Sequence, residues 1–127
     1  MKKLAVVGFL GSMILGAGVA QGTTTDAQPI VQIAIAKVKP GTQEAFKTAV
    51  EKILKPTRAE AGNVSYHYIQ SIQDPTEFIF VEVWKSNEAI DTHMSTPFLK
   101  AFFAEVGPLF EVGYPILKKY QNAEKNN

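Results

Sequence analysis

The sequence predicts one α+β domain of the ferredoxin-like kind, a βαββαβ sandwich in which two helices cover one face of an antiparallel sheet. Three observations lead to this fold class. Four β-rich segments and two helical segments alternate in that order over residues 30–117. A short turn joins the middle two strands, as in an antiparallel hairpin. The strand segments are also apolar on both alternating faces, so both faces of the sheet need to be covered.

The first strand and the first helix are expected over residues 30–38 and from Thr42 to near Pro56. The segment IVQIAIAKV at 30–38 is rich in β-branched residues, and a Pro-Gly pair stops it. Thr42 is expected to cap the helix. Its apolar residues then recur at helical spacing, at Phe46, Val50, Ile53 and Leu54. Pro56 ends this helix, or one further turn leads to Gly62.

Two strands joined by a tight turn follow, over residues 64–72 and 77–84. The connecting residues 73–76 read QDPT, and a proline at this place presets the backbone dihedral of a turn. We therefore expect the two strands to form an antiparallel hairpin.

The second helix is expected in two halves. Ser86 is the expected N-cap of the first half. Thr96 is the expected N-cap of the second half, with Pro97 at its first helical position. A last strand is expected over residues 109–117, where Pro115 cannot donate a ladder hydrogen bond and so belongs on an edge or at a bulge. The apolar stripe of the second half-helix is Phe98, Phe102, Phe103 and Val106.

Both faces of the expected sheet are apolar. The strand at 77–84 carries Phe78, Phe80 and Trp84 on one face and Ile79, Val81 and Val83 on the other. Two helices cover only one face, and an open apolar sheet face exceeds the patch of a few hundred Å² that a soluble monomer tolerates. A homodimer packed sheet to sheet is therefore the expected assembly.

Residues 1–20 have the anatomy of a secretory signal peptide: two lysines, an uncharged apolar run, and small residues at Gly18 and Ala20. We expect cleavage after Ala20 and an exported protein, periplasmic or secreted. The apolar run is shorter than the about 20 residues of a spanning helix, so no stable membrane insertion is expected after cleavage. Residues 21–29 are then a flexible lead-in, 30–117 the domain and 118–127 a polar tail.

Charge and cysteine content narrow the function further. The 13 Lys and Arg face 12 Asp and Glu, so the loss of Lys2 and Lys3 with the leader changes the formal charge from +1 to −1. This balance does not suggest a nucleic-acid partner. The chain has no cysteine, which excludes a thiol enzyme and a cysteine-ligated metal.

The strongest candidate site lies where the third strand meets the second helix. Trp84 and Glu82 share a face of the strand, and His93 lies at the border of the helix's apolar stripe. A histidine beside a tryptophan wall can act as a base. It can equally be a partly buried side chain that only packs or caps, and the sequence leaves both roles open.

The strand at 64–72 carries a further histidine and two tyrosines. Tyr66 and Tyr68 share one face of their strand and His67 takes the other. Cross-strand packing is the ordinary role of such tyrosines, and His67 is expected in solvent or at an interface. His67, His93 and Glu82 are the residue types of a two-histidine, one-carboxylate iron site, but their spacing gives no support, so no metal is expected.

Three stretches together resemble a known family: KVKPGTQEAFKTAV, TRAEAGNVSYHY and DPTEFIFVEVWKSNEAIDTHMSTPFLKAF. The chain is similar to the antibiotic biosynthesis monooxygenase (ABM) domain family of the dimeric α/β barrel superfamily. The resemblance covers nearly all of residues 30–117. Its most specific parts are Pro40-Gly41, residues 62–66, Glu82-x-Trp84, and His93 followed by Thr96-Pro97-Phe98.

The resemblance implies a homodimer whose sheets form a barrel, with a pocket in each subunit between the sheet and the broken helix. Similar members include quinol and anthrone-type monooxygenases that use no metal, flavin or nicotinamide cofactor. Trp84 and His93 match the family's motif positions and are the expected catalytic residues, and we expect both to face this pocket. The expected pocket residues are Tyr66, Glu82, Phe98 and Phe102, either phenylalanine closing the pocket.

Two functions follow as hypotheses. The first is an exported, cofactor-independent monooxygenase that oxidises a small aromatic, quinol-like substrate with O2. The second is a non-catalytic dimer that binds a small apolar ligand in the same pocket.

Overall fold

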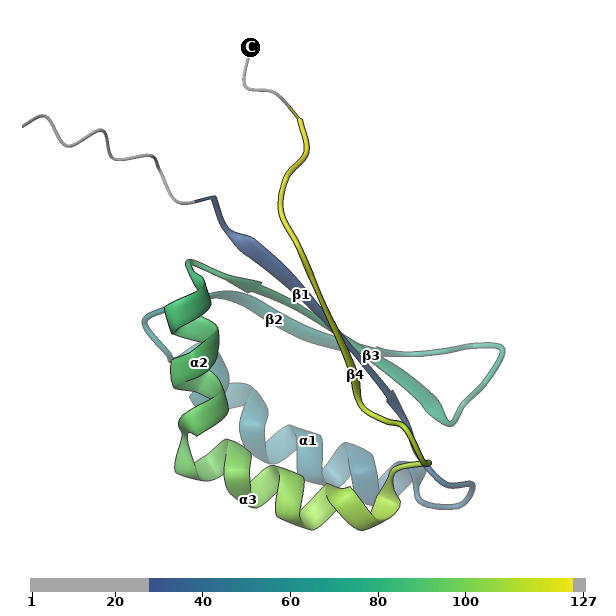
Figure 1. Ribbon diagram of the computed structural model, residues 1–127. Helices are drawn as coiled ribbons and strands as arrows, with labels where there is room; N and C mark the ends of the chain where they lie inside the picture. Colours follow the sequence, from purple (N-terminus) through teal and green to yellow (C-terminus); the bar gives the residue numbers. More distant parts are fainter. Residues whose placement is uncertain (1–27, 125–127) are drawn as a thin grey trace, which may run out of the picture.

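The computed structural model describes residues 28–124 (Figure 1). The expected leader at 1–20 and most of the expected lead-in lie outside this range. The elements are β1 (Ile30–Lys37), α1 (Gln43–Arg58), β2 (Asn63–Gln70), β3 (Glu77–Trp84), α2 (Asn87–Ser95), α3 (Pro97–Val106), a 3-10 turn (Gly107–Leu109) and β4 (Ile116–Tyr120). The ferredoxin-like βαββαβ order is confirmed, with the second helix in two pieces. No helix within residues 28–124 has the length and apolar character needed to cross a membrane.

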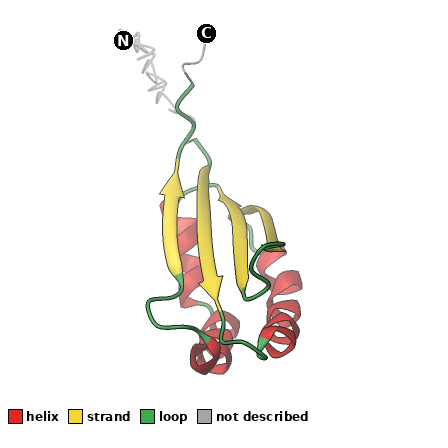
Figure 2. Ribbon diagram, turned by 90° about the vertical axis from the view of Figure 1, so that its right-hand side faces the viewer, coloured by secondary structure: helices red, strands yellow, loops and turns green. Residues whose placement is uncertain are grey.

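The strands form one antiparallel sheet in the order β2-β3-β1-β4. β1 and β3 pair over their whole length, from Ile30 opposite Trp84 to Lys37 opposite Glu77. The helices lie on one side of this sheet and leave the other side uncovered (Figures 1 and 2). Each strand therefore alternates between side chains that face the helices and side chains that face away.

The core lies between the sheet and the helices. The inward positions of the two central strands are buried: Ile30, Gln32, Ala34 and Ala36 of β1, and Phe78, Phe80, Glu82 and Trp84 of β3. Phe46 of α1 packs against Phe78 with ring centroids 4.8 Å apart. Gln32 and Glu82 are the two polar members of this inward set, and they lie directly opposite each other in the register.

The break in the second helix is confirmed and has the expected caps. The Ser86 side chain accepts a hydrogen bond from the Ala89 amide, and the Thr96 hydroxyl accepts one from the Leu99 amide with Pro97 at the start of α3. Thr96 has an extended backbone, since its ψ is 144°, so the chain changes direction there. His93 thus falls in the last turn of α2, next to the bend.

Two expectations about the elements were wrong. The Thr42 side chain does not cap α1; its hydroxyl instead donates to the Lys39 carbonyl. The last strand does not run over 109–117 but over Ile116–Tyr120, so it extends into the expected polar tail. Residues 107–115 form a 3-10 turn and a bend in which Gly113 has a φ of 86°, a left-handed conformation that breaks a strand.

The uncovered face of the sheet is apolar at its centre. We call it the open face; its central residues are the three cross-strand pairs Val31 and Val83, Ile33 and Val81, and Ile35 and Ile79. These side chains are half-buried by their neighbours on the sheet. Towards the edges, Ile69 is 55% and Ile116 is 39% exposed, so the apolar surface continues onto β2 and β4.

Gly62→Ala is expected to destabilise the fold. A Cβ at Gly62 would overlap the Cβ of Ala89 on α2 and lie 3.3 Å from its Cα. Because backbone must move to relieve that overlap, we expect the free energy of unfolding to fall by about 1–3 kcal/mol. Gly107→Ala is the matched control, since no atom of the described residues lies within 4 Å of its Cβ position. Urea unfolding of both variants checks this, and equal stability of the two would contradict it.

Candidate functional site

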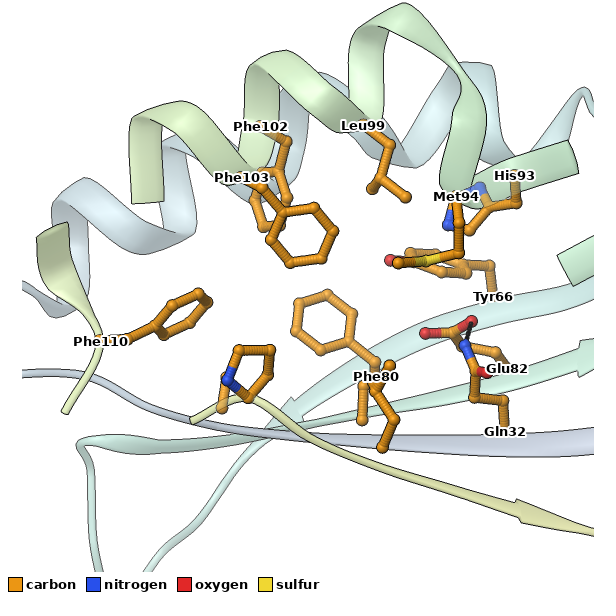
Figure 3. A pocket seen from close by; sticks show the side chains of 14 residues that line it. Gln32, Tyr66, Phe80, Glu82, His93, Met94, Leu99, Phe102, Phe103 and Phe110 are labelled. Atoms are coloured by element: carbon orange, nitrogen blue, oxygen red, sulfur yellow. Dashed lines mark hydrogen bonds between the residues drawn. The ribbon is translucent and has the colours of Figure 1, made fainter. Parts of the chain in front are cut away.

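A small cavity lies between the inward face of the sheet and helices α2 and α3 (Figure 3). Its volume is about 30 Å³, which is the space of about one water molecule. One end is polar and is formed by Gln32, Tyr66, Glu82 and His93. The rest is apolar and mostly aromatic, with Phe80, Phe102, Phe103 and Phe110 among its lining residues.

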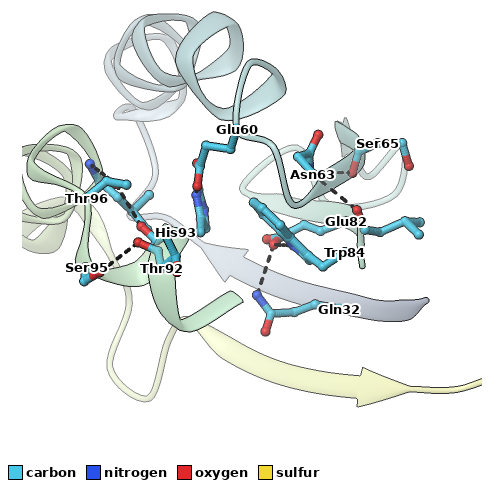
Figure 4. Close-up of polar contacts among 12 residues, drawn as sticks. Gln32, Glu60, Asn63, Ser65, Glu82, Trp84, Thr92, His93, Ser95 and Thr96 are labelled. Atoms are coloured by element: carbon cyan, nitrogen blue, oxygen red, sulfur yellow. Dashed lines mark hydrogen bonds and ion pairs between the residues drawn. The ribbon is translucent and has the colours of Figure 1, made fainter. Parts of the chain in front are cut away.

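His93 is held by a carboxylate and by aromatic rings. Its side chain is 2% exposed, and its Nδ1 lies 2.6 Å from Oε1 of Glu60, in the turn after α1 (Figure 4). The imidazole lies against the Trp84 ring, with centroids 4.6 Å apart. Since Nδ1 is hydrogen-bonded to Glu60, Nε2 is the ring nitrogen that remains available to a ligand in the cavity.

Glu82 accepts two hydrogen bonds at one oxygen. Its Oε2 lies 2.8 Å from Nε1 of Trp84 and 3.0 Å from Nε2 of Gln32. Burial raises the pKa of the Glu82 carboxyl above its ordinary value, although both hydrogen bonds act in the opposite direction. The Gln32 Oε1 atom is buried and has no hydrogen-bond partner among residues 28–124, so this end of the cavity holds an unpaired polar atom.

Tyr66 places a hydroxyl group beside these residues. It is 3% exposed, and its ring contacts those of Phe80, Trp84 and His93. Burial raises the pKa of the Tyr66 hydroxyl, and the nearby carboxylates of Glu82 and Glu60 raise it further. The group therefore stays protonated at neutral pH and can donate a hydrogen bond to a ligand.

Two of the expected pocket residues do not line the cavity. Trp84 is fully buried behind His93 and Glu82, where it supports both of them rather than forming a wall. Phe98 packs near His93, with ring centroids 6.2 Å apart, and lines the groove between α1 and α3. Phe102 does line the cavity, as do Tyr66, Glu82 and His93.

The two histidines lie on opposite faces of the sheet. His67 of β2 is exposed and points away from the helices, whereas Tyr66 and Tyr68 point towards them. His67, His93 and Glu82 are therefore not brought together. Within residues 28–124, no group of three or more histidine, cysteine, aspartate or glutamate side chains is placed to hold a metal ion.

Among the site residues that sequence reasoning missed are Glu60, Gln32 and Met94. Met94 follows His93, is 37% exposed and lines the solvent side of the cavity. Gln32 had a signal, because it is a polar residue at an inward position of an apolar strand. Glu60 had none, since it lies in a turn 33 residues from its partner His93.

Glu82→Gln is expected to change how stability depends on pH. The pKa of Glu82 is raised in the folded chain, above the ordinary 4.5 of the unfolded chain. The stability that the protonated Glu82 carboxyl contributes is therefore fully present below pH 4.5. It is lost as the pH rises through the raised pKa of the folded chain, because the buried carboxyl must then ionise. Urea unfolding between pH 4 and 8 should show the wild type losing stability relative to Glu82→Gln as the pH rises. Parallel curves would contradict this.

The sequence also matches known proteins. The family model described as antibiotic biosynthesis monooxygenase matches residues 29–105, which is more than half of the chain. The chain belongs to the antibiotic biosynthesis monooxygenase family. This match spans β1 to α3 and so includes Gln32, Glu60, Glu82 and His93.

Individual relatives agree with membership of the antibiotic biosynthesis monooxygenase family. The Bacillus subtilis protein "Putative monooxygenase YcnE" is 32% identical over 76 residues, covering 60% of this chain and 80% of that protein. The Synechocystis "Uncharacterized protein sll1783" is 35% identical over 74 residues, 58% of this chain, but the chain spans only 50% of that relative's length.

A solved structure from Nitrosomonas europaea, described as "Putative antibiotic biosynthesis monooxygenase", superposes with a TM-score of 0.73 at 25% identity. The superposition covers 80% of this chain and 96% of that one. This chain therefore has the ferredoxin-like βαββαβ fold of the antibiotic biosynthesis monooxygenase family, which belongs to the dimeric α/β barrel superfamily.

Proposed function

We propose that this protein is a cofactor-independent monooxygenase that oxidises a small aromatic, quinol-like substrate with O2. The observation that carries the proposal is the pairing of His93 with Glu60 at the polar end of an aromatic-lined cavity. An imidazole whose Nδ1 is engaged by a carboxylate can accept a proton at Nε2. The names of two similar proteins, from Bacillus subtilis and Nitrosomonas europaea, support the same class of reaction.

The reaction proposed here needs no resident redox group, because the substrate is the reductant. His93 removes a proton from a substrate hydroxyl, and the electron-rich anion then reacts with O2. One oxygen atom forms a new C–O bond to the ring and the other leaves as water, so quinol and O2 give hydroxyquinone and water. The four electrons that reduce O2 come from the quinol. Tyr66 and Glu82 lie where they can bind the oxygens of the ring.

The cavity must open to admit such a substrate. Ligand pockets commonly have about 300–1,000 Å³, whereas this cavity has about 30 Å³. Met94 and Leu117 line it and are 37% and 47% exposed, so both lie at its solvent side. A methionine side chain is unbranched and adapts readily, and its rotation is the smallest movement that would enlarge the entrance.

We also propose that the protein acts as a homodimer formed through the open face, which otherwise leaves three apolar cross-strand pairs uncovered.

Export, expected from residues 1–20, stays a prediction. N-terminal sequencing of protein from fractionated cells checks it, and an intact Met1 in the cytosolic fraction would contradict it.

The test of function is O2 consumption by purified protein with a panel of substituted quinols. Substrate-dependent uptake of O2, with one molecule of hydroxyquinone formed per O2, supports the proposal. The alternative is a ligand-binding dimer without catalysis. It would give a rise in melting temperature with the same quinols but no uptake above the rate without protein.

A further inference from the structure

The Glu60 and His93 pair is built by two elements that contact each other closely. Glu60 lies in the turn between α1 and β2, where its amide donates to the Thr57 carbonyl at 3.1 Å and its carbonyl accepts from the Asn63 amide at 3.0 Å. Both hydrogen bonds fix its backbone. The same turn packs against α2, where Gly62 leaves no room for a side chain next to Ala89. The close approach of Gly62 to Ala89 therefore holds this turn, which carries Glu60, against α2.

Among the neighbours of the His93 ring, Glu60 is the one that binds it. The rings of Trp84, Tyr66 and Phe98 contact the imidazole with centroids 4.6–6.2 Å away. The second nearby carboxylate, Glu82, is engaged by Trp84 and Gln32 instead. The only hydrogen bond of the imidazole within residues 28–124 is the 2.6 Å contact between Nδ1 and Glu60.

We propose that Glu60 is a positioning residue: it holds His93 in the tautomer with the proton on Nδ1, so that Nε2 presents a lone pair to the cavity. A carboxylate oxygen only accepts hydrogen bonds, so Nδ1 must donate. A neutral imidazole has one ring proton, and fixing it on Nδ1 leaves Nε2 as acceptor and base. This inference rests on the proposed function for its catalytic meaning, but the tautomer itself can be measured without any substrate.

The experiment uses the full mature chain labelled with ¹⁵N, and long-range proton-nitrogen NMR spectra of the histidine rings at pH 7.5. The chain has two histidines, and the exposed His67 is an internal control in every spectrum. In the wild type, we expect His93 to show a protonated Nδ1 and a bare Nε2. In Glu60→Leu, this pattern should be lost and should move towards that of His67, while the His67 signals stay unchanged.

A second readout separates positioning from packing. If quinol turnover is found, Glu60→Leu should lower kcat by about tenfold or more, as loss of the partner that orients an active histidine does. Glu60→Gln should retain more activity, because its amide oxygen can still accept from Nδ1. The control is Glu105→Leu, which removes an exposed carboxylate paired with Lys52 and should leave kcat unchanged.

The outcomes decide the proposal whether or not the protein is a monooxygenase. A wild-type His93 that carries its proton on Nε2, or on both nitrogens, would overturn it. The wild-type pattern persisting in Glu60→Leu would overturn it too. If Glu60→Leu does not fold, the same NMR comparison is made between Glu60→Ala and the wild type. Absence of turnover in the wild type with the expected NMR pattern would refute the proposed reaction and leave the role of Glu60 supported.

Discussion

His93→Gln is expected to lower quinol turnover by about a hundredfold or more, the loss typical of removing a general base. Glutamine is chosen because its amide can donate to Oε1 of Glu60 as Nδ1 does, while it has no basic nitrogen. Alanine would be a poorer test. It would leave the Glu60 carboxylate, whose side chain is only 14% exposed, without its partner, and that costs stability of about 1–3 kcal/mol by itself.

The control for His93→Gln is His67→Gln, which changes the exposed histidine on the opposite face of the sheet. We expect its turnover to equal that of the wild type. The melting temperature of each variant should be measured together with kcat. If His93→Gln retains wild-type turnover in an assay where the wild type is active, His93 is a packing residue and has no part in proton removal.

The order of elements could be predicted because local signals determine it. The hairpin follows from a proline turn between two β-rich segments, and the helix break follows from a threonine cap followed by proline at Thr96-Pro97. The last strand could not be placed by the same means. Leu109, Phe110 and Val112 look like strand residues, but Val112 is 98% exposed in a bend. Apolar composition alone does not distinguish a strand from the loop that leads to it.

The site could be predicted only in part, because its geometry depends on contacts between distant segments. His93 and Glu82 were found from helix and strand periodicity and Tyr66 from the family resemblance, and the three do meet at the cavity. Trp84 and His93 were expected to face the pocket together, yet the Trp84 ring lies behind the imidazole. The partner of His93 comes from a turn, where no periodicity operates, so Glu60 could be found only from the folded chain.

Val81→Glu is expected to convert the proposed homodimer into a monomer. Val81 lies near the middle of the open face, opposite Ile33 of β1 and His67 of β2. A stable interface of about 1,200–2,000 Å² would bury this position, and an unpaired charge buried there costs several kcal/mol. Since each 1.4 kcal/mol is tenfold in Kd, the Kd should rise by about a thousandfold or more. Sedimentation and light scattering at micromolar concentration measure this.

Ile72→Glu is the matched control, because it adds the same charge at a position that is 96% exposed in the turn between β2 and β3. It should keep the mass of the wild type. A wild type that is itself monomeric at micromolar concentration would contradict the dimer.

The neighbours of Val81 in β3, Phe80 and Glu82, face the cavity, so the turnover of a folded, monomeric Val81→Glu also bears on the site. Retained activity would show that one chain forms a complete site, and lost activity would show that the second sheet must support β3.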